Sequence, residues 1–192
     1  MVKSFLKKII IWILEIEARI VLKKYKPRIV AITGSVGKTS TKDAVFSIFS
    51  RFFNARKSKK SYNSDIGVPL AILDCESGWY SPLLWIKNIL KGLGIIFGKE
   101  NYPEWLILEM GVEGKGDIEN LLKIVKPKVG VITFIGELPV HVEFFASPEE
   151  LAREKSKLVK ALGGDDFAVL NFDDDTVFSL KDEIKARVLG YG

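Results

Sequence analysis

Short apolar segments alternate with longer segments of helical periodicity along most of the chain. The apolar segments, rich in β-branched residues as buried strands are, read RIVAIT (28–33), WLILEMG (105–111), KVGVITFIG (128–136), FAVLNF (167–172) and ARVLGYG (186–192). Helices are expected at 38–53, 117–125, 147–162 and 176–184. This alternation indicates an α/β fold with a mostly parallel sheet and helices on both faces. In such sheets ligands bind beyond the carboxyl ends of the strands.

The first 26 residues have a different pattern and predict a basic, apolar helix that precedes the domain of residues 27–192. Apolar side chains recur at helical spacing at Phe5, Ile9, Trp12 or Ile13, Ile16 and Ile20, with lysines at both ends. Glu15, Glu17 and Arg19 interrupt the apolar run and disfavour a helix that spans a bilayer. Two interpretations stay open. The helix lies on an anionic membrane surface, or it packs against its own domain or a partner.

Charge is distributed unevenly along the chain. The formal net charge is +5, of which residues 1–28 carry +6, so the remainder is close to neutral. A nucleic-acid-binding surface on the domain is therefore not expected. The length of 192 residues and the hydrophobic content of 47% are those of one domain with a sizeable core. The single Cys75 excludes an internal disulfide framework and favours a cytoplasmic protein, with peripheral contact at the inner face of the membrane if the first helix lies there.

The segment VAITGSVGKTSTK (30–42) is interpreted as a phosphate-binding loop between a strand and a helix. The common pattern G-x-x-x-x-G-K-[ST] would place its first glycine at position 32, which is Ile32, whereas the glycine here is Gly34. Lys38 would neutralise the β- and γ-phosphates of ATP, and the Thr39 hydroxyl would bind Mg²⁺. The expected nucleotide-binding residues are Gly34, Ser35, Val36, Gly37, Lys38, Thr39 and Ser40.

Three further side chains are candidates for the site. Glu109 ends an apolar strand, so its carboxylate is expected at the ligand edge, either holding Mg²⁺ or capping the next loop. His141, the only histidine, follows the third strand, and a neutral imidazole there can bind a metal or be merely structural. Lys155 lies in a run of charges that a solvated helix face would also explain.

Five blocks in order resemble the Mur ligase family. TGSVGKTSTK resembles its ATP loop, T-G-[ST]-x-G-K-T-[ST], and is most like that of the branch that adds D-alanyl-D-alanine to UDP-muramoyl tripeptide. The other blocks are YNSDIGVPLAIL, LILEMGVEGKGDI, VGVITFIGELPVHVEFFASPEELAREKSKLV and AVLNFDDD. The resemblance covers about residues 29–175 and implies the P-loop NTPase-like central domain of this family.

The resemblance also implies a reaction and roles for these residues. ATP would phosphorylate a carboxylate of a UDP-muramoyl peptide, and the amine of an amino acid or dipeptide would then displace phosphate to form an amide. Lys38 would stabilise the charge that accumulates on the transferred phosphoryl group. Thr39, Glu109, His141 and Lys155, the last as a carbamate, would hold Mg²⁺ ions. Asn63 would contact phosphate or substrate.

Several departures from the family pattern leave alternatives open. The chain is two residues longer between Gly136 and His141, and Phe134 replaces an asparagine. The usual UDP-binding and C-terminal domains are not recognised, so we expect an ATP-binding part that is C-terminally incomplete and does not ligate alone. The alternatives are a non-catalytic nucleotide-binding or membrane-docked module and a folylpolyglutamate- or cyanophycin-synthetase-like ligase. The apolar insert at 79–105 is interpreted as a second membrane-surface or partner-binding helix, or as ordinary core.

Overall fold

The computed structural model describes residues 2–59, 61–78, 81–99, 101–136, 145 and 147–192, with the backbone alone for residues 2–7. Its centre is a six-stranded sheet in the order β2-β3-β1-β4-β5-β6, in which every pair of neighbours is parallel. The strands are β1 (Arg28–Thr33), β2 (Ala55–Lys57), β3 (Trp105–Glu109), β4 (Val129–Ile132), β5 (Phe167–Asn171) and β6 (Arg187–Tyr191). The predicted parallel α/β fold is therefore confirmed.

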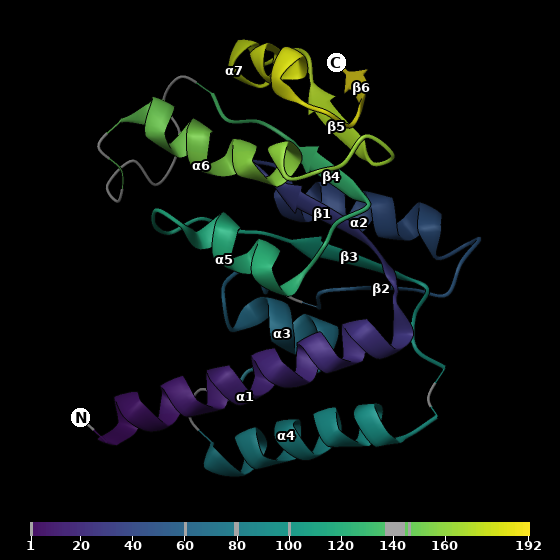
Figure 1. The fold of residues 1–192 in the computed structure, drawn as a ribbon, viewed down its shortest axis with the longest axis vertical. Coiled ribbons are helices and arrows are strands. Elements are labelled where there is room, and N and C mark those ends of the chain that lie inside the picture. The colour runs from purple at the N-terminus through teal and green to yellow at the C-terminus, as the bar shows by residue number, and fades with distance from the viewer. Residues whose placement is uncertain (1, 60, 79–80, 100, 137–144, 146) are drawn as a thin grey trace.

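Helices cover both faces of the sheet, because alternate residues of the central strands point to opposite sides. Ile29 and Ala31 of β1 belong to the core cluster that also contains residues of α1, α3, α5 and α6, whereas Val30 and Ile32 pack with α2. The helices are α1 (Val2–Tyr25), α2 (Lys38–Phe49), α3 (Gly67–Ile72), α4 (Pro82–Phe97), α5 (Asp117–Ile124), α6 (Pro148–Lys160) and α7 (Asp175–Phe178), which continues as the 3-10 helix η2 (Ser179–Glu183). Figure 1 shows α1 and α4 side by side at the end of the molecule farthest from β6.

Helix α1 packs into the domain with one face. Leu14, Ala18 and Val21 are fully buried in the main core, whereas Trp12 on the other side is 62% exposed. The sequence left open whether the first helix lies on a membrane or packs against its own domain. The face of α1 that contains Leu14, Ala18 and Val21 packs against the domain. No helix among the described residues has the length and apolar character needed to cross a bilayer.

Helix α4 runs beside α1 and begins and ends with defined hydrogen bonds. The Ser81 side chain accepts a hydrogen bond from Leu84 N, and Pro82 occupies the first turn. At the other end the Lys24 ammonium of α1 donates to the carbonyl oxygens of Ile95, Ile96 and Gly98, at 3.2, 2.9 and 2.5 Å. A cation at the end of a helix satisfies its last carbonyls and its dipole, so α1 fixes where α4 ends.

Buried at the contact between these helices is an ionisable side chain, Glu17 of α1. It is 3% exposed, and neither of its carboxylate oxygens has a hydrogen-bond partner within the described part of the chain. A Cβ built on Gly92 of α4 would lie 2.2 Å from Glu17 Oε2, so any other residue there would require this carboxyl group to move. Burial raises the pKa of Glu17 to about 7.

Candidate functional site

The loop between β1 and α2 forms the centre of the site. Gly34 has a φ of 149°, and Gly37, directly before α2, has a φ of 83°. A Cβ on Gly34 would lie 2.0 Å from Thr133 Oγ1, so the backbone conformation and the close approach of the chain after β4 both require glycine. The loop leads into the N-terminus of α2, where unpaired backbone N–H groups favour an anion.

Lys38 at the start of α2 is folded back over this loop. Its Nζ donates hydrogen bonds to the carbonyl oxygens of Gly34, at 2.8 Å, and Ser35, at 3.3 Å. Partial burial lowers the pKa of Lys38, and the charge of Glu109 acts in the opposite direction. The ammonium group therefore lies inside the curve of the loop, where a phosphate group would bind.

Ser35 connects the loop to two other elements. Its backbone N–H donates to the Phe134 carbonyl oxygen at 2.6 Å, and its hydroxyl donates to the Ile135 carbonyl oxygen at 3.0 Å. The same hydroxyl oxygen accepts a hydrogen bond of 2.7 Å from Lys155 Nζ. Residues that are 120 positions apart in sequence thus meet at one side chain of the loop.

Lys155 is buried rather than on a solvated helix face, which was the alternative interpretation of its sequence context. It is 3% exposed, although it lies within a strongly charged segment of α6. Burial, with a further contribution from the nearby Lys38 charge, lowers the pKa of Lys155 to about 7. A substantial fraction of this amine is therefore neutral near pH 7.

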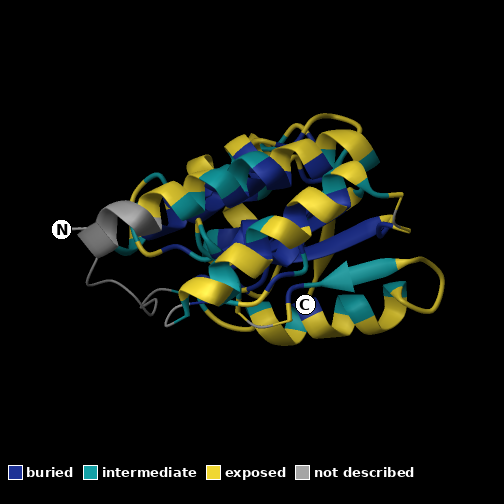
Figure 2. Ribbon diagram, turned by 90° about the horizontal axis from the view of Figure 1, so that it is seen from below, coloured by how far each residue is buried: buried dark blue, intermediate teal, exposed yellow. Residues whose placement is uncertain are grey.

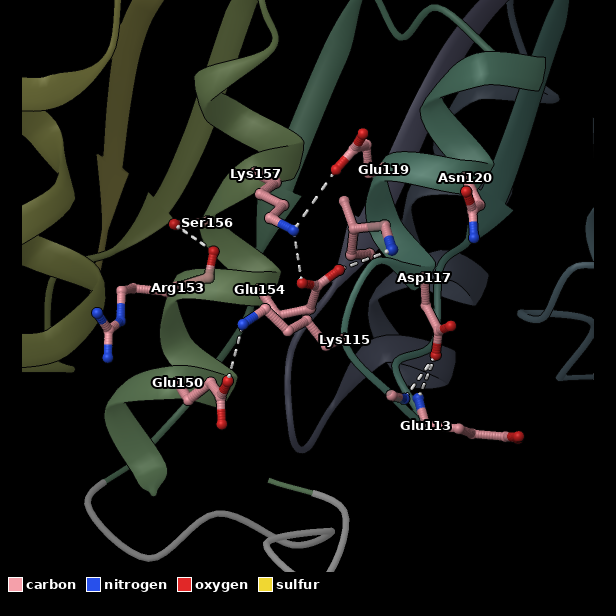
Figure 3. Close-up of polar contacts among 12 residues, drawn as sticks. Glu113, Lys115, Asp117, Glu119, Asn120, Glu150, Arg153, Glu154, Ser156 and Lys157 are labelled. Carbon is pink, nitrogen blue, oxygen red and sulfur yellow. Dashed lines mark hydrogen bonds and ion pairs between the residues drawn. The ribbon is translucent and has the colours of Figure 1, made fainter. Parts of the chain in front are cut away.

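A polar network joins α6 to α5 through Glu154, the residue before Lys155 (Figure 3). Glu154, 3% exposed, accepts a hydrogen bond of 3.1 Å from Ile118 N in the first turn of α5 and one of 2.7 Å from Lys157 Nζ. A carboxylate at the start of a helix is stabilised by the helix dipole. These contacts hold α6 against α5, and Lys155, the next residue of α6, reaches the loop through its own hydrogen bond to Ser35.

Glu109 and Thr39, each interpreted from the sequence as a candidate Mg²⁺ ligand, lie in contact with one another. Glu109 ends β3 and is 2% exposed. Its Oε2 accepts a hydrogen bond of 3.0 Å from Thr39 Oγ1, and its Oε1 accepts one of 3.2 Å from Asn63 Nδ2. A carboxylate and a hydroxyl in contact at the edge of a phosphate loop are ligands that suit a hard divalent cation.

Two features of this pair were not foreseen from the sequence. Lys42, one turn after Lys38 on α2, is 2% exposed and its Nζ lies 3.7 Å from Glu109 Oε2. Asn63, expected from the sequence to contact phosphate or substrate, lines the cavity beside the loop, and its amide also donates to Glu109. The spacing of four residues from Lys38 to Lys42 was a usable signal, because residues i and i+4 share a helix face.

No other metal site is evident within the ranges that the structure describes. These residues contain no group of three or more His, Cys, Asp and Glu side chains placed to hold a metal ion. The predicted ligand His141 lies outside the described residues.

A cavity of about 490 Å³ opens beside the loop. Its lining includes Gly34, Lys38, Asn63 and Lys155 on one side, and the lining side chain Ile11 comes from α1. The carboxyl groups of Asp65, Glu113 and Asp117 also line it, and burial, followed by the other two carboxylates, raises the pKa of Asp65. The cavity is therefore cationic near the loop and anionic near α5, which suits a ligand with both phosphate and cationic or hydrogen-bond-donor groups.

The chain after β4 is held against the loop by a buried carboxylate. Asp174 is 4% exposed, and its Oδ2 accepts hydrogen bonds of 2.7 and 2.9 Å from Ile135 N and Gly136 N. Its Oδ1 accepts from Val177 N and so caps α7. The third predicted strand, 128–136, ends at Ile132. Thr133 N still donates to Thr33 O of β1, but the backbone groups of residues 134–136 bind Ser35 and Asp174 instead of a neighbouring strand.

Comparison with known proteins places this geometry in a family. The sequence profile of the Mur ligase middle domain matches residues 93–192. The UDP-N-acetylmuramoyl-tripeptide–D-alanyl-D-alanine ligase of Borreliella burgdorferi is 33% identical over 150 residues, which are 78% of this chain and 27% of that protein. The ligase of the same name from Mycobacterium leprae is 31% identical over 161 residues, 84% of this chain and 26% of that protein. The chain spans about a quarter of the length of these curated relatives.

Solved structures agree with this placement. The MurF ligase of Thermotoga maritima in complex with ADP superimposes with a TM-score of 0.71 at 27% identity, over 95% of this chain and 36% of that one. MurF of Acinetobacter baumannii has the same fold, with a TM-score of 0.71 at 23% identity over 94% of this chain and 34% of that one.

Proposed function

The chain belongs to the Mur ligase family, and we propose that it is the ATP-binding part of an ATP-dependent amide ligase of peptidoglycan precursor synthesis. The observation that carries the proposal is the loop geometry. Gly34 and Gly37 adopt positive φ, and Lys38 Nζ lies against the loop carbonyls. The ADP complex of the related Thermotoga maritima ligase supports the same ligand class.

In this proposal Lys38 leaves its carbonyl partners and neutralises the β- and γ-phosphates, while the loop amides hold the phosphate oxygens. The carboxylate of a UDP-muramoyl peptide attacks the γ-phosphorus, ADP leaves, and an acyl phosphate forms. The amine of an amino acid or dipeptide, D-alanyl-D-alanine in the curated relatives, then attacks the acyl carbon. Phosphate leaves, and the amine loses a proton as the amide forms. The preorganised cationic groups would stabilise the added negative charge of both steps.

Thr39 and Glu109 are the residues we propose for Mg²⁺, and their hydroxyl and carboxylate oxygens fit that ion. Mg²⁺ would supply charge neutralisation at the phosphates. Lys42 would balance the buried charge of Glu109, from which it lies 3.7 Å, and Asn63 would orient that carboxylate. His141 remains a candidate ligand from the sequence alone.

We propose that Lys155 is carbamylated. A buried amine with a lowered pKa is nucleophilic toward carbon dioxide, and the carbamate formed is an anionic oxygen ligand. In a full-length ligase that contains these residues, Lys155→Ala should abolish turnover, and short carboxylic acids should partly restore it. A fully active alanine variant would contradict this role.

The test of nucleotide binding is calorimetry with ADP and Mg²⁺. Lys38→Ala should weaken binding at least tenfold, about 1.4 kcal/mol, because it removes the cation nearest the phosphates. Lys123→Ala is the matched control, since Lys123 is an exposed lysine of α5. Equal affinity of the Lys38 variant and the wild type would refute the site.

We propose further that these 192 residues bind ATP without ligating. The chain spans about a quarter of its relatives, and orientation of both reactants supplies roughly 7–11 kcal/mol of the barrier reduction in reactions of this kind. Amide formation from UDP-muramoyl tripeptide, ATP and D-alanyl-D-alanine is the measurement. Robust turnover by the 192 residues alone would contradict the proposal.

For location, we propose a cytoplasmic protein with peripheral contact to the inner membrane face through residues 1–26. The support is the charge of +6 over residues 1–28 and the exposed outer face of α1, which includes Trp12. Deleting this segment would remove Leu14, Ala18 and Val21 from the core, so the sharper test is Trp12→Glu in a vesicle flotation assay. Unchanged flotation of that variant would argue against contact through α1.

A further inference from the structure

We propose that the outer face of α4 is a docking surface for an anionic lipid bilayer. The surface consists of one apolar stripe along the whole helix, called here the α4 stripe. Its members and their exposed fractions are Leu83 (77%), Ile86 (55%), Leu90 (62%), Leu93 (39%) and Phe97 (83%).

The α4 stripe is not part of the core. At 100° per residue its five members fall within a sector of roughly 80°. The buried residues of the same helix, Asn88, Gly92 and Ile95, lie on the opposite side and face α1 and the chain that follows α3. The helix thus has two apolar faces, and its own domain covers only one of them.

Charge favours an anionic partner. Residues 82–99 contain Lys87, Lys91 and Lys99 and no acidic residue, and residues 1–28 of the neighbouring α1 region carry +6. Lys91 is bound to Asp74, at 3.1 Å, and Lys87 is exposed beside the stripe. Because the whole chain has a charge of +5, these two segments hold all of its positive excess. Basic side chains next to an exposed apolar helix face are typical of interfacial helices on anionic membranes.

Position and shape agree with a flat, extended partner. Helix α4 is the outermost element at its end of the molecule, beyond α1 (Figure 1). The view from that side shows exposed positions along the helices that face the viewer (Figure 2). Sixteen residues of helix are roughly 24 Å long, and the stripe runs along a convex ridge rather than a groove. None of its residues lines the cavity beside the phosphate loop, so a docked membrane would leave that site open.

A second copy of the chain is the competing occupant, and charge argues against it. A two-fold interface through the α4 stripe would bring the same surface of both copies together. Lys87 of each copy would then lie close to that of the other with no acidic residue on either helix to compensate. Anionic lipid headgroups attract the same lysines.

The experiment is flotation of the full chain with phosphatidylcholine vesicles, with and without phosphatidylglycerol. The wild type should float only with the anionic vesicles, and less at high salt because the headgroup attraction is screened. The double substitution L83E/L90E should reduce the bound fraction at least tenfold. Ile48→Glu is the matched control, since Ile48 is an equally exposed residue of α2, at 60%, and it should float like the wild type.

The three other outcomes each overturn the proposal. The first is flotation of L83E/L90E at the wild-type level. The second is loss of flotation in the Ile48→Glu control as well. The third is a wild-type dimer in light scattering that the double substitution dissociates, without flotation of either protein. Circular dichroism and a thermal melt establish that the variants are folded, and ADP binding, which the α4 stripe does not touch, separates failure here from failure of the proposed nucleotide site.

Discussion

Replacing Glu17 by glutamine should change how stability depends on pH. The folded-state pKa of Glu17 is about 7, whereas the ordinary value is 4.5, because the carboxyl group is buried between α1 and α4 without a hydrogen-bond partner among the described residues. Between these two values the folded chain holds a proton that the unfolded chain has lost. The contribution of Glu17 is therefore fully present below pH 4.5 and is lost as the pH rises to about 7.

The size of this effect follows from the shift. One pKa unit corresponds to about 1.4 kcal/mol, so the loss across the window is at most about 3.5 kcal/mol, and about 1–3 kcal/mol after relaxation of the site. Glutamine has nearly the same shape and does not ionise in this range. The free energy of unfolding of Glu17→Gln should consequently fall less between pH 5 and pH 8 than that of the wild type. For a domain of this size, about 2–4 °C of melting temperature accompanies each kcal/mol.

The assay is urea unfolding at a series of pH values, and the quantity compared is the pH slope rather than the absolute stability. The titratable neighbour of Glu17 is Cys75, whose pKa burial raises to about 11, so the thiol stays neutral throughout the range. Glu104→Gln, an exposed site, is the control and should keep the wild-type slope. Identical slopes for the Glu17 variant and the wild type would show that the carboxyl group is solvated in solution.

Three other substitutions test the fold around the site. Gly34→Ala should weaken ADP binding in calorimetry and cost about 1–3 kcal/mol of stability. A Cβ there would meet Thr133 Oγ1 at 2.0 Å, in a backbone conformation that favours glycine. Wild-type affinity of the variant would contradict the required loop geometry. Asp174→Asn should cost about 1–3 kcal/mol in urea unfolding, because a carboxylate that accepts three backbone hydrogen bonds through its two oxygens becomes an amide with one acceptor atom. An unchanged midpoint would refute its part in holding the loop. Ser81→Ala should cost about 1 kcal/mol, measured in the same way, by removing the cap of α4, and no loss would mean that this end of α4 is frayed.

The parts of the fold that repeat locally were predictable, and the contacts between distant segments were not. The strand 28–33 and the helix starts at Lys38 and Asp117 coincide with the structure, since periodicity and glycine positions determine them. The short β2 and α3 were missed, because three to six residues carry little periodicity. The helix predicted for 38–53 ends at Phe49, as the chain turns toward β2.

The same division holds for the site. The phosphate loop, Glu109 and Lys155 could be selected from the sequence because each belongs to a recognisable block. Two contacts of the site could not be predicted because they depend on how α6 and α7 pack, which no local pattern encodes. Ser35 joins Lys155 to the Ile135 carbonyl oxygen, and Asp174 holds the chain after β4. The spacing from Lys38 to Lys42 indicated that both lie on one face of α2, but the burial of Lys42 depends on its packing against Glu109 of β3.

The hydrogen bonds of Lys38 to its own loop have a consequence for the kinetics of ligand entry. The ammonium group already occupies the place of a phosphate partner and keeps the carbonyls of Gly34 and Ser35 turned inward. A nucleotide therefore replaces existing contacts and does not have to order a loose segment. We expect association to be a single, fast phase without a slow conformational step. The contribution of Lys38 to the binding free energy should then be the difference between its contacts with the phosphates and its contacts with the loop carbonyls.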